Sequence, residues 1–328
     1  MRLFANANYD FIGNTRWVLA VLALLILPGL GLLVVQGANY SVEFTGGTLM
    51  QVQTNEAMDV AVLRSALADQ GVRGAEIQQF GSSREFVVRA ITAKEGADAD
   101  DTQATSQAVT AALNASVGAG AYTILRTEAV GPKVGGELRT QAVWLVLLSF
   151  VAVLLYLAFR FEWRFGVAAV VATIHDIVAA IAFVGLARIE ISLFVVGALL
   201  SIVGYSLNDK IVVLDRVREN LHKHRRDDFA GLLNRSINET LPRTVFTGTT
   251  ALGSLVALAA LGGEVVRGFA LVMLYGVVVG TISSMFVAAP VLLWIEQRWP
   301  GTSVKGLPGA PKAGPGSPAA GRKAHAAS

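Results

Sequence analysis

Six stretches of this sequence are long and apolar enough to cross a lipid bilayer, and they decide its fold class. A helix needs about 20 mainly apolar residues to span the roughly 30 Å of hydrocarbon in a membrane. Inside that hydrocarbon the backbone must pair its own N–H and C=O groups, as a helix does. We therefore predict a polytopic α-helical membrane protein with six transmembrane helices, near residues 17–35, 141–159, 165–186, 191–214, 244–261 and 269–294.

About 100 residues between the first two spans have a different pattern. Residues 40–54 alternate apolar with polar side chains around a bend at Gly46-Gly47, which is typical of a strand. Apolar residues recur at helical spacing twice further on. The predicted elements are a strand at 40–54, a helix at 60–67, strands at 75–80 and 85–91, a helix at 109–117 and a strand at 122–127. This order predicts a ferredoxin-like α+β external domain over residues 39–138.

Charge predicts the orientation. Residues 39–138 carry 12 acids and 7 bases, a net charge of −5, whereas the rest of the chain carries +8. Lys and Arg of short loops mark the cytoplasmic side, and the two short loops on the other side hold only Arg188 and Arg267. We expect both termini to be cytoplasmic and the external domain to lie outside. The expected parts are 1–38, the N-terminus with an uncleaved first span; 39–138, the external domain; 139–299, a five-helix bundle with a cytoplasmic loop at 215–243; and 300–328, a disordered tail rich in Gly, Pro and Ala.

Two acids fall inside predicted spans, where a charge costs roughly 2.5–3.5 kcal/mol on insertion scales. Asp209 follows Asn208 in the fourth span, and Asp176 follows His175 in the third. Acids kept at this cost line a water path, pair with a buried partner or move protons. The helix face of Asp176 favours burial, because it is made of small residues: Ala169, Ala172, Thr173, Ala179 and Ala180. Asp176 is equally compatible with a purely structural role as a hydrogen-bond acceptor.

The neighbouring spans carry small and polar stripes. Spacing of i, i+4, i+7 and i+11 recurs in Gly197, Ser201, Gly204 and Asn208 of the fourth span, and in Arg243, Thr247, Thr250 and Ser254 of the fifth. The sixth span adds a close-packing face of Gly276, Gly280 and Ser284.

These stripes suggest a proton pathway. Burial favours the neutral form of an acid and a nearby guanidinium favours the charged form, so Asp209 and Arg243 would make a proton-responsive pair linked by hydroxyl groups. Arg243 alone is also compatible with an interfacial anchor. The predicted pathway residues are Asp209, Arg243, Asp176, His175, Asn208, Thr247 and Thr250.

Other chemistry has no motif in the sequence. We find no phosphate-binding loop and no hydrolase nucleophile pattern. His222 and His224 lack further ligands at a known metal spacing. We therefore predict a transport accessory rather than an enzyme, with no cofactor, no metal and no nucleic-acid partner, driven by an ion gradient or by a partner protein.

Several motifs resemble the SecD/SecF family of bacterial protein-export membrane proteins, in particular its smaller SecF branch. They are Y-S-V-E-F-T-G-G at 40–47, V-G-P-K-V-G at 130–135, H-D at 175–176, S-L-N-D at 206–209, V-L-D-R at 213–216 and R-T at 243–244. The resemblance spans about residues 1–299.

This resemblance implies half of an assembly of the resistance-nodulation-division superfamily, in the bacterial cytoplasmic (inner) membrane. SecD would supply the other half, and proton entry would move the external domains so that preproteins leave the SecYEG channel. Further implied partners are YajC, unfolded preproteins and membrane lipid. Asp209 and Arg243 match the family's proton-pathway positions.

Two positions depart from the family pattern. Lys210 follows Asp209 where the family usually has Thr, and Glu43 stands where Asp is commoner. A lysine there would either favour the charged form of Asp209 or replace a hydroxyl relay. Two alternative functions stay open: a half-pump subunit of a proton-driven small-molecule efflux system, and a scaffold without ion coupling. H⁺ is the expected coupling ion, with Na⁺ as the alternative.

Overall fold

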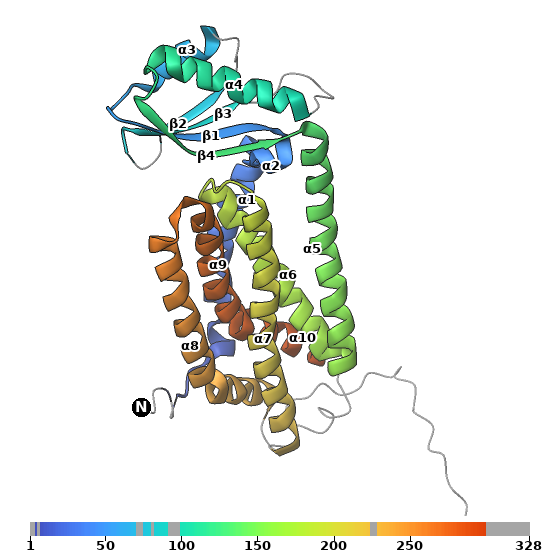
Figure 1. The fold of residues 1–328 in the computed structure, drawn as a ribbon. Coiled ribbons are helices and arrows are strands. Elements are labelled where there is room, and N and C mark those ends of the chain that lie inside the picture. Colours follow the sequence, from blue (N-terminus) through green and yellow to red (C-terminus); the bar gives the residue numbers. More distant parts are fainter. Residues whose placement is uncertain are drawn as a thin grey trace, which may run out of the picture.

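The chain forms a small sheet domain that stands on a bundle of long helices. The computed structural model describes residue 4 and residues 7–69, 75–79, 82–90, 99–223 and 228–299. Figure 1 shows the sheet domain at one end of the bundle, which we call the sheet end. The N-terminus lies at the opposite end, which we call the far end. The tail 300–328, predicted to be disordered, lies outside the described residues.

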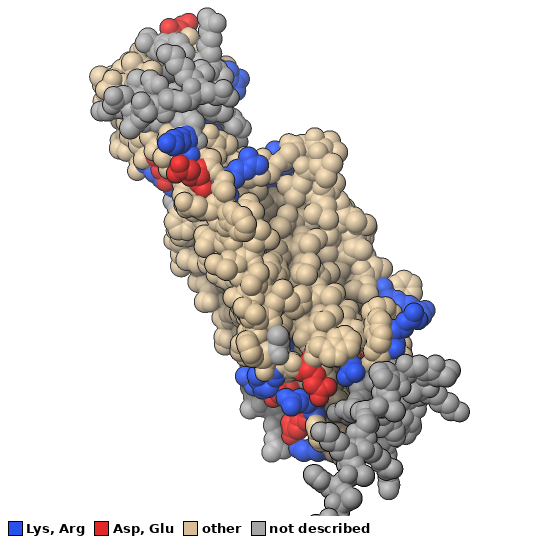
Figure 2. Space-filling model, turned by 90° about the vertical axis from the view of Figure 1, so that its right-hand side faces the viewer, with Lys and Arg blue, Asp and Glu red and all other residues tan. Residues whose placement is uncertain are grey.

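Six helical spans long and apolar enough to cross a membrane form the bundle, as predicted. On the face drawn in Figure 2, charged residues gather toward the two ends and leave a wide uncharged belt between them. On this face, the hydrocarbon of a bilayer around the belt would meet no Lys, Arg, Asp or Glu among the described residues. The spans are α1 (Phe11–Gln36), α5 (Pro132–Arg160), α6 (Trp163–Leu186), α7 (Leu193–Lys223), α8 (Phe229–Leu261) and a last span made of α9 (Gly263–Ser283), the π-helix η1 (Ser284–Ala288) and α10 (Ala289–Arg298).

The predicted cytoplasmic loop 215–243 is mostly helical. Helix α7 continues to Lys223 and α8 already begins at Phe229, while residues 224–227 lie outside the description. The two helix ends hold each other at the far end of the bundle. The Asn220 side chain donates a hydrogen bond to Ser236 Oγ at 3.0 Å, and Arg216 pairs with Glu239 at 2.7 Å. These polar side chains form contacts between helices, which explains why a polar stretch is not a loop.

Three spans form the centre of the bundle. In the most apolar stretch of α6, of α7 and of the last span, half or more of the residues are buried, whereas in α1, α5 and α8 fewer than a fifth are. The predicted close-packing face of the last span is confirmed: a methyl group on Gly276 would lie 2.3 Å from Ile202 Cδ1, and one on Gly280 would lie 3.0 Å from Ser206 Cβ. The last span therefore packs directly on the part of α7 that leads to Asp209.

The sheet domain has the predicted order of strands and helices. Its four strands pair antiparallel in the order β2-β3-β1-β4. Two helices cover one face of the sheet, and the other face looks toward the bundle (Figure 1). The core between sheet and helices contains Met50, Leu63, Phe86 and Leu113. The elements are β1 (Gly47–Thr54), α3 (Val60–Asp69), β2 (Glu76–Gln79), β3 (Glu85–Ala90), α4 (Ala99–Ser116) and β4 (Tyr122–Val130).

One element of this domain differs from the prediction. The strand expected at 40–54 begins only at Gly47, because Val42–Thr45 forms a short helix, α2. Gly46 and Gly47 take positive φ angles of 75° and 123°, a backbone region that favours glycine. The two glycines therefore turn the chain from α2 into β1.

Candidate functional site

Asp209 and Lys210 are neighbours on α7 but face different helices, because successive residues of a helix point about 100° apart. Lys210 faces α6, where its Nζ lies 2.6 Å from Asp176 Oδ2. Ser206, one turn earlier on α7, hydrogen-bonds to both groups. His175 Nδ1 lies 3.1 Å from the second oxygen of Asp176. The result is a closed polar network inside the bundle.

This network is deeply buried. Asp176, Lys210 and Ser206 all have 0% exposure, and so does the small-residue face of α6 that was predicted to point inward. The predicted burial of Asp176 is thus confirmed. The ion pair between Lys210 and Asp176 was not predicted from the sequence. Lys210 forms no ion pair with its described neighbour Asp209.

Asp209 faces the last span. It is 3% exposed, and Thr281 of α9 donates a hydrogen bond of 3.5 Å to its Oδ2. The Tyr205 hydroxyl, one turn earlier on α7, is buried and makes no hydrogen bond within the described residues. Thr281 was missed in the sequence, although it directly follows Gly280 of the close-packing face. Asp209 therefore sits among hydroxyl groups of α7 and α9.

Asp209 and Arg243 were predicted to form a proton-responsive pair linked by hydroxyl groups, and among the described residues the structure shows neither a direct contact nor a link through Thr250. Within the described part of the chain no ion pair joins the two residues, and Arg243 is exposed on α8, directly after Pro242. The hydroxyls that were expected to link them bind elsewhere. Thr250 donates to the backbone oxygens of Phe246 and Thr247, at 3.1 and 2.9 Å. The Arg243 guanidinium acts on Asp209 only through space.

Both polar stripes of α7 and α8 lie at the surface of the bundle. On α7 the exposed members are Ser201, Gly204 and Asn208; on α8 they are Arg243, Thr250 and Ser254, with Thr247 half-buried. We call this surface the α7–α8 face. A methyl group on Gly204 would meet nothing within 4 Å. Polar and small residues at membrane depth are typical of helix–helix contacts rather than of lipid-facing surfaces.

The sheet domain is attached to the bundle through α2. The Glu43 carboxylate accepts a hydrogen bond from the backbone N–H of Leu193, the first residue of α7, at 2.6 Å. Backbone hydrogen bonds between the chain before α2 and the α6–α7 loop add to this contact: Ile191 N–H donates to Asn39 O at 2.7 Å, and Ser41 N–H donates to Ile191 O at 3.0 Å. Glu43 thus caps the helix that carries Asp209 and Lys210.

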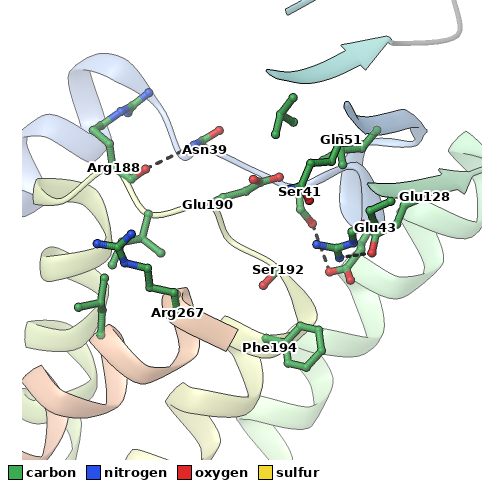
Figure 3. A pocket seen from close by; sticks show the side chains of 16 residues that line it. Asn39, Ser41, Glu43, Gln51, Glu128, Arg188, Glu190, Ser192, Phe194 and Arg267 are labelled. Carbon is green, nitrogen blue, oxygen red and sulfur yellow. Dashed lines mark hydrogen bonds and ion pairs between the residues drawn. The ribbon is translucent and has the colours of Figure 1, made fainter. Parts of the chain in front are cut away.

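A polar cavity of about 340 Å³ lies beside this attachment, between the sheet and the loops at the sheet end (Figure 3). Glu190 of the α6–α7 loop lines it and pairs with Arg89 of β3 at 2.6 Å. Burial raises the pKa of Glu190 above its ordinary range, although Arg89 opposes this, and Glu43 and Glu128 add to the rise. The cavity wall therefore holds an acid that is protonated more readily than an exposed glutamate.

Comparison with protein families finds matches over most of the chain. Residues 109–298 match the family model described as protein export membrane protein SecD/SecF, C-terminal. Residues 31–58 match the model of the SecD/SecF GG motif. The second match includes Glu43, Gly46 and Gly47, which form the attachment described above.

Curated relatives extend the match to about nine tenths of the chain. The protein translocase subunit SecF of Gemmatimonas aurantiaca is 52% identical over 304 residues, which are 92% of this chain and 91% of the relative. The SecF subunit of Escherichia coli O157:H7 is 37% identical and covers 88% of both chains.

A solved structure has the same fold. The crystal structure of SecDF, a translocon-associated membrane protein from Thermus thermophilus, superposes with a TM-score of 0.76 at 39% identity. The match covers 89% of this chain but only 39% of that longer polypeptide.

Proposed function

The chain belongs to the SecD/SecF family of protein-export membrane proteins, and we propose that it works as a SecF-type subunit that couples proton entry to late steps of preprotein translocation. In this proposal it pairs with a SecD-type partner and acts beside the SecYEG channel. Its external domain then helps preproteins leave on the outer face of the bacterial cytoplasmic membrane.

The proposed orientation puts both termini in the cytoplasm. The N-terminus lies at the far end of the bundle, opposite the sheet domain (Figure 1), which fits an odd number of crossings between them. The far end also carries most of the loop bases, including Arg160, Arg164, Arg216 and Arg218, and such bases mark the cytoplasmic side. The sheet domain would then work on the outer face of the cytoplasmic membrane.

The SecD-type partner is proposed to cover the α7–α8 face. The Thermus SecDF polypeptide is much longer than this chain, which matches 39% of it, so in that protein a second part accompanies the matched one. Here that part would be a separate chain. Arg243, Asn208 and the hydroxyl groups of the α7–α8 face would otherwise meet hydrocarbon, where a charge is costly.

The observation that carries the proposed coupling is the setting of Asp209. This acid is 3% exposed, accepts a hydrogen bond from Thr281 and forms no ion pair within the described residues. It can therefore gain or lose a proton without breaking a salt bridge. Arg243 acts on it through space from the α7–α8 face, where a partner helix would complete the site.

The geometry also offers a route from this site to the outside. Glu43 of the sheet-domain attachment caps the N-terminus of α7, and Asp209 lies on the same helix. A helix moves as a rigid unit over this length, so a shift of α7 that follows proton exchange would pull on the attachment of the sheet domain.

The test is translocation of a preprotein into membrane vesicles that contain the Sec channel, the SecD-type partner and either the wild-type chain or Asp209→Asn. A proton gradient should stimulate translocation with the wild type and not with the variant, at equal amounts of assembled complex. Asp215→Asn, an exposed acid of the same helix, serves as the control. Gradients of H⁺ and Na⁺ imposed separately identify the coupling ion. Normal stimulation with Asp209→Asn would refute the proton role.

A further inference from the structure

The two acids buried in the bundle differ in one respect, which is the presence of a fixed cation. Asp176 has Lys210 at 2.6 Å, whereas Asp209 has only the Thr281 hydroxyl. Both acids are almost fully buried, so solvent does not explain the difference. The difference comes from the direction of two neighbouring side chains on α7.

The Lys210 ammonium group is fully satisfied where it lies. Its three hydrogens have three acceptors: Asp176 Oδ2 at 2.6 Å, the backbone oxygen of Ser206 at 3.4 Å, and the Ser206 hydroxyl. Asp176 is satisfied as well, because Oδ2 accepts from Lys210 and Ser206 while Oδ1 contacts His175. A buried pair is stable only when such additional hydrogen bonds complete it.

Breaking this pair would leave one charge alone in the low-dielectric interior. An uncompensated buried charge is among the most destabilising defects in a folded protein. The pair also joins α6 to α7, two of the three spans at the centre of the bundle. Its charges are therefore expected to stay in place while α7 exchanges a proton elsewhere.

We propose that Lys210 is a positioning residue that keeps Asp176 permanently ionised and clamps α6 to α7, so that of the two buried acids only Asp209 exchanges a proton. This inference deepens the proposed function and rests on it for the role of Asp209. It removes Asp176 and His175 from the predicted proton pathway. From the sequence, Lys210 was expected either to favour the charged form of Asp209 or to replace a hydroxyl relay. The proposed role differs from both.

The other groups around both acids are consistent with this division. The charged and titratable groups that face Asp176 are Lys210 and His175. Those that act on Asp209 are Lys210 and Arg243, both through space, and the Tyr205 hydroxyl lies one turn away on the same helix. Of these two acids, only Asp176 has a cation in direct contact within the described part of the chain.

The test uses dicyclohexylcarbodiimide on the full-length chain in membranes. A protonated carboxyl group gives its proton to a carbodiimide nitrogen, and its oxygen then bonds to the central carbon. The adduct rearranges to a stable N-acylurea, which mass spectrometry of peptides locates. In the wild type, Asp209 should be modified at least about tenfold faster than Asp176, because an adjacent opposite charge changes the protonated fraction of an acid by about 10- to 1000-fold.

Lys210→Met supplies the second arm. It should raise the rate at Asp176 by about tenfold or more and change the rate at Asp209 far less. If this variant does not fold, the neutral pair Asp176→Asn/Lys210→Met should recover folded protein, because no charge is left alone. Equal modification of both acids in the wild type would overturn the proposal. So would an unreactive Asp176 in folded Lys210→Met.

These arms do not depend on secretion. An unreactive Asp176 in the wild type together with normal gradient stimulation of Asp209→Asn would refute the proposed function while leaving the clamp intact. A reactive Asp176 together with loss of stimulation in Asp209→Asn would refute the clamp and leave the proposed function.

Discussion

The carboxylate of Glu43 accepts a hydrogen bond of 2.6 Å from the backbone N–H of Leu193, although the two residues are 150 positions apart in the sequence. A helix leaves its first N–H groups without partners, and a side-chain oxygen that accepts from one of them stabilises the helix. Here the oxygen comes from the attachment of the sheet domain, and the helix is the one that carries Asp209. This contact therefore links the attachment of the sheet domain directly to the start of α7.

Glu43→Ala should loosen the start of α7. Loss of a capping oxygen costs about 1 kcal/mol, which corresponds to roughly fivefold faster hydrogen exchange for amides of the first turn of α7. Mass spectrometry of exchange in detergent or nanodiscs measures this. Glu56→Ala, an exposed acid of the same domain, should leave this exchange unchanged. An unchanged first turn in Glu43→Ala would show that the cap does not hold the helix.

Gly135 allows α5 to approach the attachment of the sheet domain. A methyl group there would lie 2.9 Å from the backbone nitrogen of Gly46 and 3.2 Å from Phe44, neither of which can move away easily. Gly135→Ala should therefore destabilise the protein by about 1–3 kcal/mol through overpacking. Thermal unfolding of the purified chain measures this.

The adjacent glycine is a matched control for this prediction. A methyl group on Gly136 would meet nothing within 4 Å. Gly136→Ala should unfold at the wild-type temperature or slightly above it, since alanine favours a helix by up to about 1 kcal/mol over glycine. Equal losses in the two variants would show that the close approach of α5 to Gly46 is not what makes Gly135 sensitive.

Glu190 should make stability depend on pH. Its pKa is raised in the folded protein, mainly by burial, so between its ordinary and its raised pKa the folded chain holds more protons than the unfolded chain. The free energy of unfolding therefore falls as pH rises through this window. Above the window, Glu190 is ionised in both states and the full loss of stability is present. Glu190→Gln should remove this part of the slope in unfolding curves recorded at a series of pH values. An identical slope in variant and wild type would contradict the assignment.

The sequence predicted the architecture because its signals are strong and local. Six apolar stretches define six spans, and period-two alternation separated by turns defines the sheet domain. The helix α2 was missed because its four residues are too few to show a helical period. The helical ends in 215–243 were missed because their polar residues contact each other, and a polar pattern alone does not distinguish such contacts from a solvated loop.

The contacts between the site residues were harder to predict than the identity of these residues. Asp209, Asp176 and Arg243 were recognised from the cost of charge in a membrane, but that cost says nothing about which helix each side chain faces. The sequence put Asp209 beside Lys210 and matched it with Arg243. The structure pairs Lys210 with Asp176 and brings Thr281 to Asp209. Neighbouring residues of a helix point about 100° apart, so Asp209 and Lys210 face different helices. Which helices they face depends on how α6, α7 and the last span pack.

Arg243 should be needed for coupling although it does not touch Asp209. Its guanidinium acts through space on the acid and lies exposed on the α7–α8 face. Arg243→Met should reduce gradient-stimulated translocation to the unstimulated level while the chain still folds. Arg218→Met, an exposed base near the far end, is the control. Full stimulation in Arg243→Met would make this residue an interfacial anchor only.

Gly204 should be essential for the partner and unimportant for the chain itself. A methyl group at this exposed position meets nothing within 4 Å in the described chain, so we expect Gly204→Leu to fold with wild-type thermal stability. If a helix of the SecD-type partner packs on the α7–α8 face, the leucine would hold it away, because small residues are what permits close approach in a membrane. Co-purification of the tagged chain with the partner should therefore be lost. Gly31→Leu on α1, where a methyl group also meets nothing, should retain the partner. Retention of the partner by both variants would place the contact on another surface of the bundle.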